Sequence, residues 1–407
     1  MQDTPKGNRL HIAMFGRRNV GKSSLINALT SQSIALVSAV PGTTADPVYK
    51  AMEMLPLGPV MMIDTAGIDD EGTLGTLRVE KTMQVLTKTD LAILVLSAET
   101  GVSAYEQTIA AAIRERGIPL VGVLNKMDTA AFNQSKLEEW GKALELSLVP
   151  VSAVEHKGLE QVKQQIIKQA PGDWDSMPVI GDLLNPGDTV VLVVPIDLAA
   201  PKGRLILPQV QTIRDILDHD AYSLVVKERE LKEALGNLRK PPRLVVTDSQ
   251  EFLKVDADTP PEIMLTSFSI LFARHKGDLE TLVSGAKAID RLQPGDRVLI
   301  AEACTHHRQA DDIGKVKIPR WLRQRIGGEL EFNWVSGGEF PADLSSYKLI
   351  VHCGSCMLTR REMLYRLSVA RQANVPIVNY GVLIAWVHGI LPRALLPFPA
   401  ARSILED

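Results

Sequence analysis

The strongest constraint on the fold lies near the amino terminus. An apolar run at residues 10–15 leads directly into G-x-x-x-x-G-K-S at residues 16–23, which opens a stretch with helical spacing. This order predicts a phosphate-binding loop between a strand and a helix, where glycines let backbone N–H groups wrap a phosphate. Lys22 would add charge at the β- and γ-phosphates, and the Ser23 hydroxyl would ligate Mg²⁺. Arg17, inside the loop, is expected to be a solvated surface residue.

Three later segments, at residues 61–67, 120–128 and 149–153, complete a nucleotide site, and the last of them supplies the loop that closes over the base. Residues 61–67 begin as an apolar strand that ends in Asp64, which is placed to hold Mg²⁺ through water. The Gly67 amide, three residues later, is placed to sense a γ-phosphate. Residues 120–128 begin as another strand, which ends at a polar recognition loop that contains Asp128. Its carboxylate can accept two hydrogen bonds from guanine, whereas adenine would leave it unpaired, so the expected nucleotide is GTP. The residues expected to bind GTP are Gly16, Asn19, Val20, Gly21, Lys22, Ser23, Ser24, Asn125, Lys126, Asp128, Ser152 and Ala153.

Four motifs in this order and spacing resemble the GTPase family and, within it, the bacterial Era/TrmE-like GTPases. Residues 41–46 resemble their first switch, in which Thr44, or alternatively Thr43, would meet Mg²⁺. Ile68 stands where Ras-like proteins place a water-orienting glutamine, so unaided hydrolysis is expected to be slow. Asn19 matches a residue that helps bind a monovalent cation in potassium-activated members, which implies K⁺ stimulation. The implied catalytic set is Lys22, Thr44, Asp64 and Gly67, with Mg²⁺ held by Ser23, Thr44 and Asp64.

The remaining chain divides into two further α/β segments. A length of 407 residues allows two to four domains, and the helical pattern of residues 159–169 ends at a proline and a glycine. Strands and helices alternate in both later segments, which implies parallel sheets. We therefore expect a P-loop GTPase domain at residues 1–172, a dimerisation domain at 173–262 and a third domain at 263–407.

All three cysteines fall in two segments of the third domain. Cys304 follows one expected strand, and Cys353 and Cys356 follow another. Ligand sites in doubly wound sheets form beyond the carboxyl ends of the strands, so both segments should meet at one edge. Thiolates with nearby histidines make a soft site suited to zinc or to an iron–sulfur cluster, and the spacing alone does not separate the two.

Two histidines accompany the cysteines. His306 follows Cys304 by two positions and would point the same way in extended backbone, whereas His352 and Cys353 would point to opposite faces of a straight strand. Either histidine is a candidate fourth ligand. A helix expected just after Thr359 places its amino terminus beyond the last cysteine, where its dipole should favour thiolate.

The pattern Cys304-x-His306, then His352-Cys353-x-x-Cys356 about forty-five residues later, behind a GTPase domain, resembles the signature of the maturation GTPases of di-iron (FeFe) hydrogenases. The resemblance covers the whole chain. It implies a [4Fe–4S] cluster on Cys304, Cys353 and Cys356, so that residues 263–407 become the cluster-binding domain. It also implies a homodimeric scaffold that carries a di-iron precursor with carbonyl and cyanide ligands. Two radical S-adenosylmethionine enzymes would help to build this precursor, and the carrier would deliver it to the apo-hydrogenase.

Composition limits the other function classes. The net charge of -3 and the lack of a basic run with interleaved aromatics disfavour nucleic acid as a partner. No run of eighteen apolar residues predicts a membrane span, and clustered thiols suggest a reducing, cytoplasmic location. The main alternative is a ribosome- or tRNA-directed GTPase with a structural zinc site. A further alternative is a nucleotide-dependent interaction switch with inert cysteines.

Overall fold

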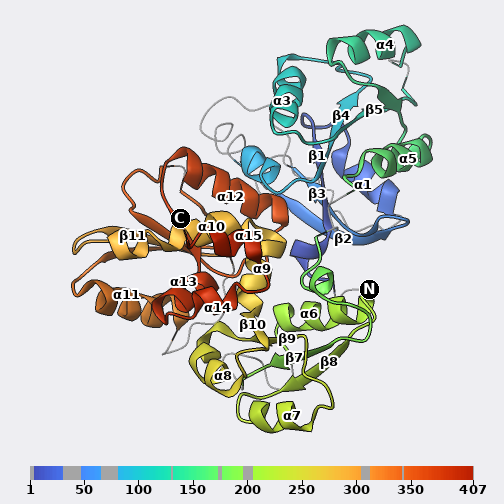
Figure 1. The fold of residues 1–407 in the computed structure, drawn as a ribbon. Coiled ribbons are helices and arrows are strands. Elements are labelled where there is room, and N and C mark those ends of the chain that lie inside the picture. Colours follow the sequence, from blue (N-terminus) through green and yellow to red (C-terminus); the bar gives the residue numbers. More distant parts are fainter. Residues whose placement is uncertain are drawn as a thin grey trace. The chain divides into compact units, whose positions relative to one another are not determined.

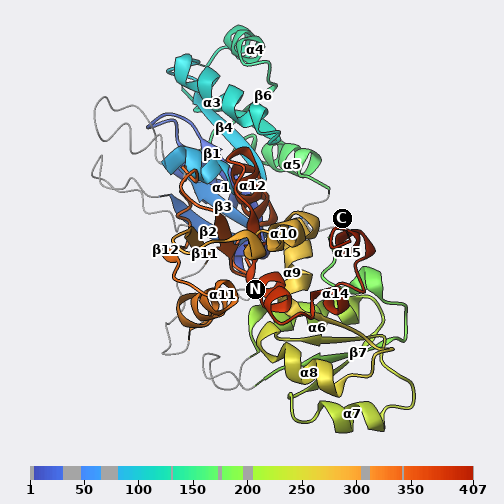
Figure 2. The same ribbon diagram turned by 60° about the vertical axis from the view of Figure 1, so that its left-hand side comes forward.

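The computed structural model describes residues 4–30, 47–65, 81–129, 132–172, 177–195, 205–303, 312–341 and 343–406. The chain divides into two compact units, Met1–Ser176 and Met177–Asp407, and each is described by itself (Figures 1 and 2).

The first unit is built on a six-stranded sheet in the order β2-β3-β1-β4-β5-β6. Only β2 runs antiparallel to its neighbour, so the sheet is mixed. The strands are β1 (Leu10–Phe15), β2 (Val48–Met54), β3 (Gly58–Asp64), β4 (Leu91–Ser97), β5 (Leu120–Asn125) and β6 (Leu148–Pro150). The helices described are η1 (Lys6–Asn8), α1 (Lys22–Thr30), α3 (Ala104–Glu115), α4 (Gln134–Ala143) and α5 (Leu159–Gln169).

Strand β1 explains why this sheet is covered on both faces. All six of its residues are buried, and successive side chains point to opposite faces. Ile12 and Met14 pack in one apolar cluster with residues of α1 and α5, whereas Ala13 and Phe15 pack in a second cluster with α3. A continuous apolar run before the phosphate loop therefore reads as a central strand of a doubly covered sheet.

The second unit contains two four-stranded sheets, and every strand pair in them is parallel. In the order β10-β9-β7-β8, the first consists of β7 (Thr189–Val193), β8 (Tyr222–Val226), β9 (Leu244–Thr247) and β10 (Met264–Ser267). In the order β12-β11-β13-β14, the second consists of β11 (Arg297–Glu302), β12 (Glu331–Ser336), β13 (Leu349–His352) and β14 (Ile377–Asn379). The expectation of a P-loop GTPase domain followed by two α/β parts with parallel sheets is confirmed.

The helices of the second unit join both sheets to one apolar core. Helix α9 packs on α6 beside the first sheet and on α12 and α13 beside the second, and the ribbon shows it between them (Figure 1). The helices are η2 (Gly181–Leu183), α6 (Leu207–Asp218), α7 (Leu231–Asn237), η3 (Ser249–Glu251), α8 (Phe252–Asp258), α9 (Phe268–Lys276), α10 (Leu279–Ala286), η4 (Ile289–Arg291), η5 (Ile313–Lys317), α11 (Ile318–Ile326), α12 (Arg360–Gln372), α13 (Tyr380–Val387), α14 (Leu391–Ala394) and α15 (Pro399–Ser403).

One detail differs from the sequence pattern. The helical pattern of residues 266–292 begins at Thr266, but in the structure Thr266 and Ser267 end strand β10, which pairs with β9. The Ser267 hydroxyl then caps α9 by accepting from the Ile270 amide at 3.2 Å, so strand and helix join without a loop. In the part of the chain that the structure describes, no helix is long and apolar enough to cross a membrane.

Candidate functional site

The phosphate loop is shaped by two glycines that no other residue could replace without movement. Gly16 has φ +149°, and a Cβ there would lie 2.3 Å from the Val95 carbonyl oxygen on β4. Gly21 has φ +91°, and a Cβ would lie 2.3 Å from Asn125 Nδ2. Between them, Asn19 adopts a left-handed φ of 62°. The loop therefore fits closely between β4 and the guanine-recognition segment.

Lys22 and Asp64 sit where phosphate and Mg²⁺ are expected. Lys22 Nζ donates to the carbonyl oxygens of Gly16 at 2.8 Å and Arg17 at 2.9 Å, so the ammonium lies over the loop. The Ser23 hydroxyl donates to Asp64 Oδ2. Among the described side chains, Asp64 Oδ1 is one of the buried oxygens without a hydrogen-bond partner.

The charge state of Asp64 points to a cation. Burial raises the pKa of Asp64, and the Ser23 hydrogen bond and the Lys22 charge act in the opposite direction. A buried carboxylate with an unpaired oxygen is costly in isolation, and a divalent cation would offset that cost. The donors present, a hydroxyl and a carboxylate, are the hard oxygen ligands that Mg²⁺ prefers.

The guanine-recognition residues are tied to the phosphate loop. Asn125 Nδ2 donates to the Val20 carbonyl at 2.9 Å, and Asn125 Oδ1 accepts from the Ala153 amide at 3.1 Å. Asp128 is exposed, and a hydrogen bond from Ser152 is the largest influence that lowers its pKa. An ionised and accessible carboxylate at this position is ready to accept from guanine.

Several expected site residues need separate mention. Lys126, with φ 64°, forms an ion pair with Glu99 at 2.6 Å, and Ser24 lies exposed on α1. Four expected site residues lie outside the described residues: Thr44, Gly67, Cys304 and His306.

Arg17 is not the solvated surface residue that the sequence suggested. Its Nε donates to Glu106 Oε1 at 2.7 Å, and Nη2 donates to the Gly101 carbonyl at 2.7 Å. Glu106 is fully buried on α3 and also accepts from the Ser103 amide and hydroxyl in a capping box. Arg17 therefore fastens the phosphate loop to the β4–α3 turn. Sequence reasoning missed this pair because its members are 89 residues apart.

Glu106→Ala is expected to lower the free energy of unfolding of the first unit by about 3 kcal/mol, because it leaves the Arg17 charge without its buried partner. Urea unfolding, monitored by hydrogen exchange of the β1 and α3 amides, measures this loss of stability. Glu115→Ala, at the exposed end of the same helix, is the control. Equal stability of the two variants would contradict the anchoring role of Arg17.

The second group of expected residues lies at the carboxyl end of β13. Cys353 and Cys356 follow that strand, and both are partly exposed free thiols. The Ala303 amide, next to Cys304 in the chain, donates to Cys353 Sγ at 3.1 Å. The Cys353 amide in turn donates to the Ala301 carbonyl at 3.0 Å. The end of β11 therefore lies directly against the Cys353 thiol.

The thiols do not have the lowered pKa that the helix dipole was expected to give. Thr359 does cap α12, since its hydroxyl accepts from the Glu362 amide at 3.1 Å. Burial nevertheless raises the pKa of Cys353, and burial together with the Cys353 charge raises the pKa of Cys356 to about 11. The buried Lys276 ammonium acts in the opposite direction on Cys356 but does not outweigh desolvation. A soft metal centre would therefore have to displace protons from both thiols.

His352 is fully buried, and both of its ring nitrogens have partners. Nδ1 lies 3.0 Å from the Cys353 carbonyl oxygen and 3.1 Å from Ser355 Oγ, and Nε2 lies 3.1 Å from Arg366 Nη1. Burial, more than the Arg366 charge, lowers the pKa of His352 to about 3, so the ring is neutral. A bond from His352 to iron would require one of these contacts to break.

Two polar residues beside Cys353 were missed by sequence reasoning. Neighbouring strands β11, β13 and β14 place Ala301, His352 and Asn379 side by side in the sheet. Glu302, Cys353 and Tyr380 are the next residues along these three chain segments. Tyr380 Oη donates to Glu302 Oε1 at 3.0 Å, and the Glu302 side chain is almost buried. The available signal was an acid two positions before Cys304, but its tyrosine partner lies 78 residues away in the sequence.

Within the described residues, no three His, Cys, Asp or Glu side chains are grouped closely enough to hold a metal ion. Two thiols that converge on the chain segment leading to Cys304 still suit a cysteine-held cluster better than a hard cation, because thiolates prefer soft metals. The donor chemistry present therefore fits the group that the sequence implied.

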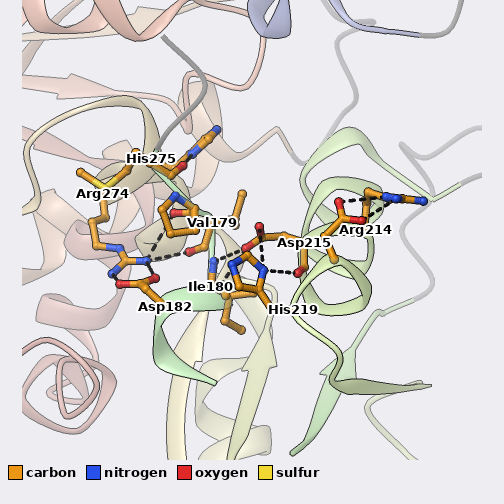
Figure 3. Close-up of polar contacts among 12 residues, drawn as sticks. Val179, Ile180, Asp182, Arg214, Asp215, His219, Arg274 and His275 are labelled. Carbon is orange, nitrogen blue, oxygen red and sulfur yellow. Dashed lines mark hydrogen bonds and ion pairs between the residues drawn. The ribbon is translucent and has the colours of Figure 1, made fainter. Parts of the chain in front are cut away.

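The second unit begins with a segment that is tied to two helices (Figure 3). Arg274 of α9 forms a two-pronged ion pair with Asp182, at 2.6 and 2.7 Å. Asp215 of α6 accepts from the Ile180 and Gly181 amides at 2.7 and 2.8 Å (Figure 3). These bonds fix residues 177–183 against the core of this unit.

His275 lies in the same network and provides a pH-dependent prediction. Its Nδ1 donates to the Met177 carbonyl at 2.6 Å, and burial is the main cause that lowers its pKa to about 4. Because this value lies below the 6.5 of a free histidine, the unfolded chain binds one more proton between the two values. The stability of the second unit will therefore fall as the pH falls through this window, by up to roughly 3 kcal/mol from this group.

An NMR titration of the histidine Cε1–Hε1 signals checks the value directly, with His275→Asn identifying the resonance. We expect this signal to stay at its neutral position until the pH approaches 4. Titration near the free-histidine value would contradict the burial argument.

Three family models match the chain. A 50S ribosome-binding GTPase model matches residues 11–126, a hydrogen maturase F dimerization domain model matches residues 179–277, and a hydrogen maturase F tetramerization domain model matches residues 280–397. Together they cover the phosphate loop, the first sheet of the second unit and most of the segment that holds the cysteines.

Individual relatives match the first part of the chain. The tRNA modification GTPase MnmE of Heliobacterium modesticaldum is 35% identical over 161 residues, which are 39% of this chain and 34% of that protein. GTPase Der of Bartonella tribocorum is 35% identical over 160 residues, 39% of this chain and 33% of that protein. The chain thus spans about a third of the length of these relatives. A solved structure of an Era variant from Aquifex aeolicus, bound to GDP and AlF4⁻, has a TM-score of 0.37 and 21% identity, covering 61% of this chain and 99% of that one.

Proposed function

The chain belongs to the hydrogen maturase F family and carries a GTPase domain, and from this premise we propose that it is a GTP-hydrolysing scaffold in the maturation of di-iron hydrogenases. In this role it holds a [4Fe–4S] cluster, carries a di-iron precursor and delivers it to the apo-hydrogenase. Two radical S-adenosylmethionine enzymes supply the precursor.

One observation carries the proposal beyond a plain GTPase. The Cys353 thiol accepts a hydrogen bond from the Ala303 amide, and the next residue in the chain is Cys304. This contact supports a shared site for cysteines that are about fifty residues apart in sequence. A switch protein with inert thiols would have no reason to place Cys353 against the strand end that leads to Cys304.

We assign one role to each part of the chain. Residues 1–172 bind and hydrolyse GTP, residues 173–262 form the dimer, and residues 263–407 hold the cluster through Cys304, Cys353 and Cys356. The cluster would supply an iron with an exchangeable position at which the di-iron cargo can attach. The hydrogen-bonded carboxylate of Glu302 and phenol of Tyr380 lie at the same end of the sheet as Cys353.

GTP hydrolysis would use the residues that the sequence motifs predict. Lys22 would contact the phosphates, Ser23 and Asp64 would hold Mg²⁺ together with Thr44, and the Gly67 amide would contact the γ-phosphate. Asp128 and Asn125 select guanine. K⁺ near Asn19 would stabilise charge on the phosphates, so exchanging sodium for potassium should raise turnover. Equal turnover in both salts would remove this role of Asn19.

Anaerobic reconstitution with iron and sulfide tests the proposed function against its alternative. A brown protein with about four irons per chain and an EPR signal on reduction supports the scaffold. Stoichiometric zinc, with tight binding of ribosomal RNA or tRNA, would overturn it in favour of a ribosome- or tRNA-directed GTPase.

The dimer is expected to form through the edge strand β8. Tyr222 and Val225 are 64% and 41% exposed, unusually high for apolar strand residues. The Tyr222 amide donates to Asp188 and the Val226 carbonyl accepts from Val194, both toward β7. Since N–H groups alternate along a strand, the Val225 amide points outward, where a second copy can pair with it.

Val225→Pro removes that outward donor and leaves the β7 ladder intact, so it should convert the dimer to monomer in light scattering. Val225→Thr keeps the amide and is the matched control, expected to stay dimeric. A proline variant that remains a dimer would place the interface elsewhere.

A further inference from the structure

We propose that Arg366 is a positioning residue that shapes the Cys353–Cys356 loop through His352, and that His352 anchors this loop instead of ligating the cluster. The identity of the bound group rests on the proposed function. The geometry of the loop in the metal-free chain does not.

Arg366 is buried inside the second unit and has several polar partners. Its side chain, on α12, is 1% exposed. Nη2 donates to the Gly337 carbonyl at 2.8 Å and to Glu362 Oε1 at 3.1 Å, and the guanidinium lies 5.2 Å from the Phe340 ring centre. A buried guanidinium fixed by so many partners has one orientation, so the directions of its Nη1 donors are fixed as well.

The Nη1 group of Arg366 determines the tautomer of His352. Arg366 Nη1 lies 3.1 Å from His352 Nε2, and a guanidinium has no acceptor atoms and stays protonated. Nε2 must therefore be the accepting nitrogen, and the single proton of the neutral ring must lie on Nδ1. The Nδ1–H then faces the Cys353 carbonyl at 3.0 Å, which can only accept.

The same proton shapes the turn between the cysteines. Ser355, with φ 58°, is a non-glycine residue in the left-handed region and is almost fully buried. Its hydroxyl oxygen lies 3.1 Å from His352 Nδ1, and the hydroxyl donates to Met363 Sδ at 3.1 Å. A left-handed serine persists where its surroundings compensate the strain, and His352 Nδ1 supplies one of the contacts to the Ser355 hydroxyl.

These contacts leave no lone pair of His352 for iron. Nε2 accepts from a buried cation, and Nδ1 carries the ring proton. Binding iron at Nε2 would leave the Arg366 guanidinium without its acceptor, beside a metal centre. Binding at Nδ1 would release the Cys353 carbonyl and Ser355, which hold the thiols in place.

The first test uses the metal-free full-length chain. In Arg366→Met, Cys353 and Cys356 should react with a thiol-labelling reagent about tenfold faster than in the wild type, because loss of buried hydrogen bonds eases local opening. Arg371→Met is the matched control on the same helix, since Arg371 is exposed and its side chain donates to the Thr281 hydroxyl at 3.2 Å. Labelled peptides identify each cysteine by mass. Equal rates in both variants and the wild type would overturn the positioning role.

The second test begins with wild-type protein. In wild-type protein with ¹⁵N-labelled histidine, the His352 side chain should show a proton on Nδ1 and an unprotonated Nε2; the reverse tautomer would overturn the proposal. After reconstitution, pulsed EPR should show no nitrogen coupling that depends on His352. A coupling lost in His352→Gln but retained in His306→Gln would make His352 a ligand and sink the inference. Wild-type chain that binds no iron would refute the proposed function, while the tautomer and thiol rates would still decide the role of Arg366.

Discussion

Cys353→Ala will leave the chain folded but unable to hold a cluster. The substitution removes one small, partly exposed thiol and leaves the backbone hydrogen bond from the Cys353 amide to the Ala301 carbonyl unaffected. The fold of the second unit should therefore persist. A [4Fe–4S] cluster with two remaining cysteines lacks the ligand set that retains it. We expect bound iron to fall from about four per chain to well below one, and activation of apo-hydrogenase to be lost. Iron and sulfide analysis after anaerobic reconstitution measures the first effect.

Met357→Ala is the control for this prediction, because Met357 lies in the same loop and is 42% exposed. It should bind iron like the wild type. If Cys353→Ala retained a full cluster, the assignment of Cys353 as a ligand would be wrong, and the third interpretation of the cysteines, as inert thiols, would gain ground.

The second large effect is expected at the other end of the chain. Lys22→Ala should reduce GTP turnover by about 100- to 1,000-fold, the typical cost of removing one positioned charge donor from a reaction centre. The Lys22 ammonium already lies against the Gly16 and Arg17 carbonyls, above the loop that would receive the phosphates. Phosphate release under saturating GTP with Mg²⁺ and K⁺ measures the loss.

Lys163→Ala serves as the control, since Lys163 forms only a surface ion pair with Glu160 at 3.6 Å and lies on α5. Cluster content should be the same in both variants, because Lys22 and the cysteines belong to different units. A Lys22→Ala chain with turnover within a factor of two of wild type would contradict the assigned phosphate site.

Local sequence signals predicted the strand and the loop at the start of the P-loop domain well. The run from Leu10 to Phe15 was expected as a strand and is one, because a continuous apolar segment before a glycine can only be buried on both faces. Gly16 and Gly21 were expected to shape the loop, and both have positive φ angles in the structure. These features depend on neighbours in the chain, which a sequence displays directly.

Long-range partners were not predictable in the same way. Arg17 was expected in solvent because its partner, Glu106, follows no spacing rule relative to the loop. His352 was a candidate ligand because the sequence shows a histidine beside a cysteine but not the buried Arg366 behind it. The thiol pKa values depend on burial, which outweighs the helix terminus that the sequence revealed. In each case a tertiary contact, rather than a local pattern, decides the chemistry.

The central claim, that this chain delivers a di-iron unit, is tested most directly by an activation assay. The protein is purified anaerobically from cells that also make the two radical S-adenosylmethionine enzymes, then mixed with apo-hydrogenase in their absence. We predict hydrogen evolution in proportion to the protein added, and none with protein from cells that lack those enzymes. A loaded, iron-containing chain that fails to activate the apo-hydrogenase would contradict the account.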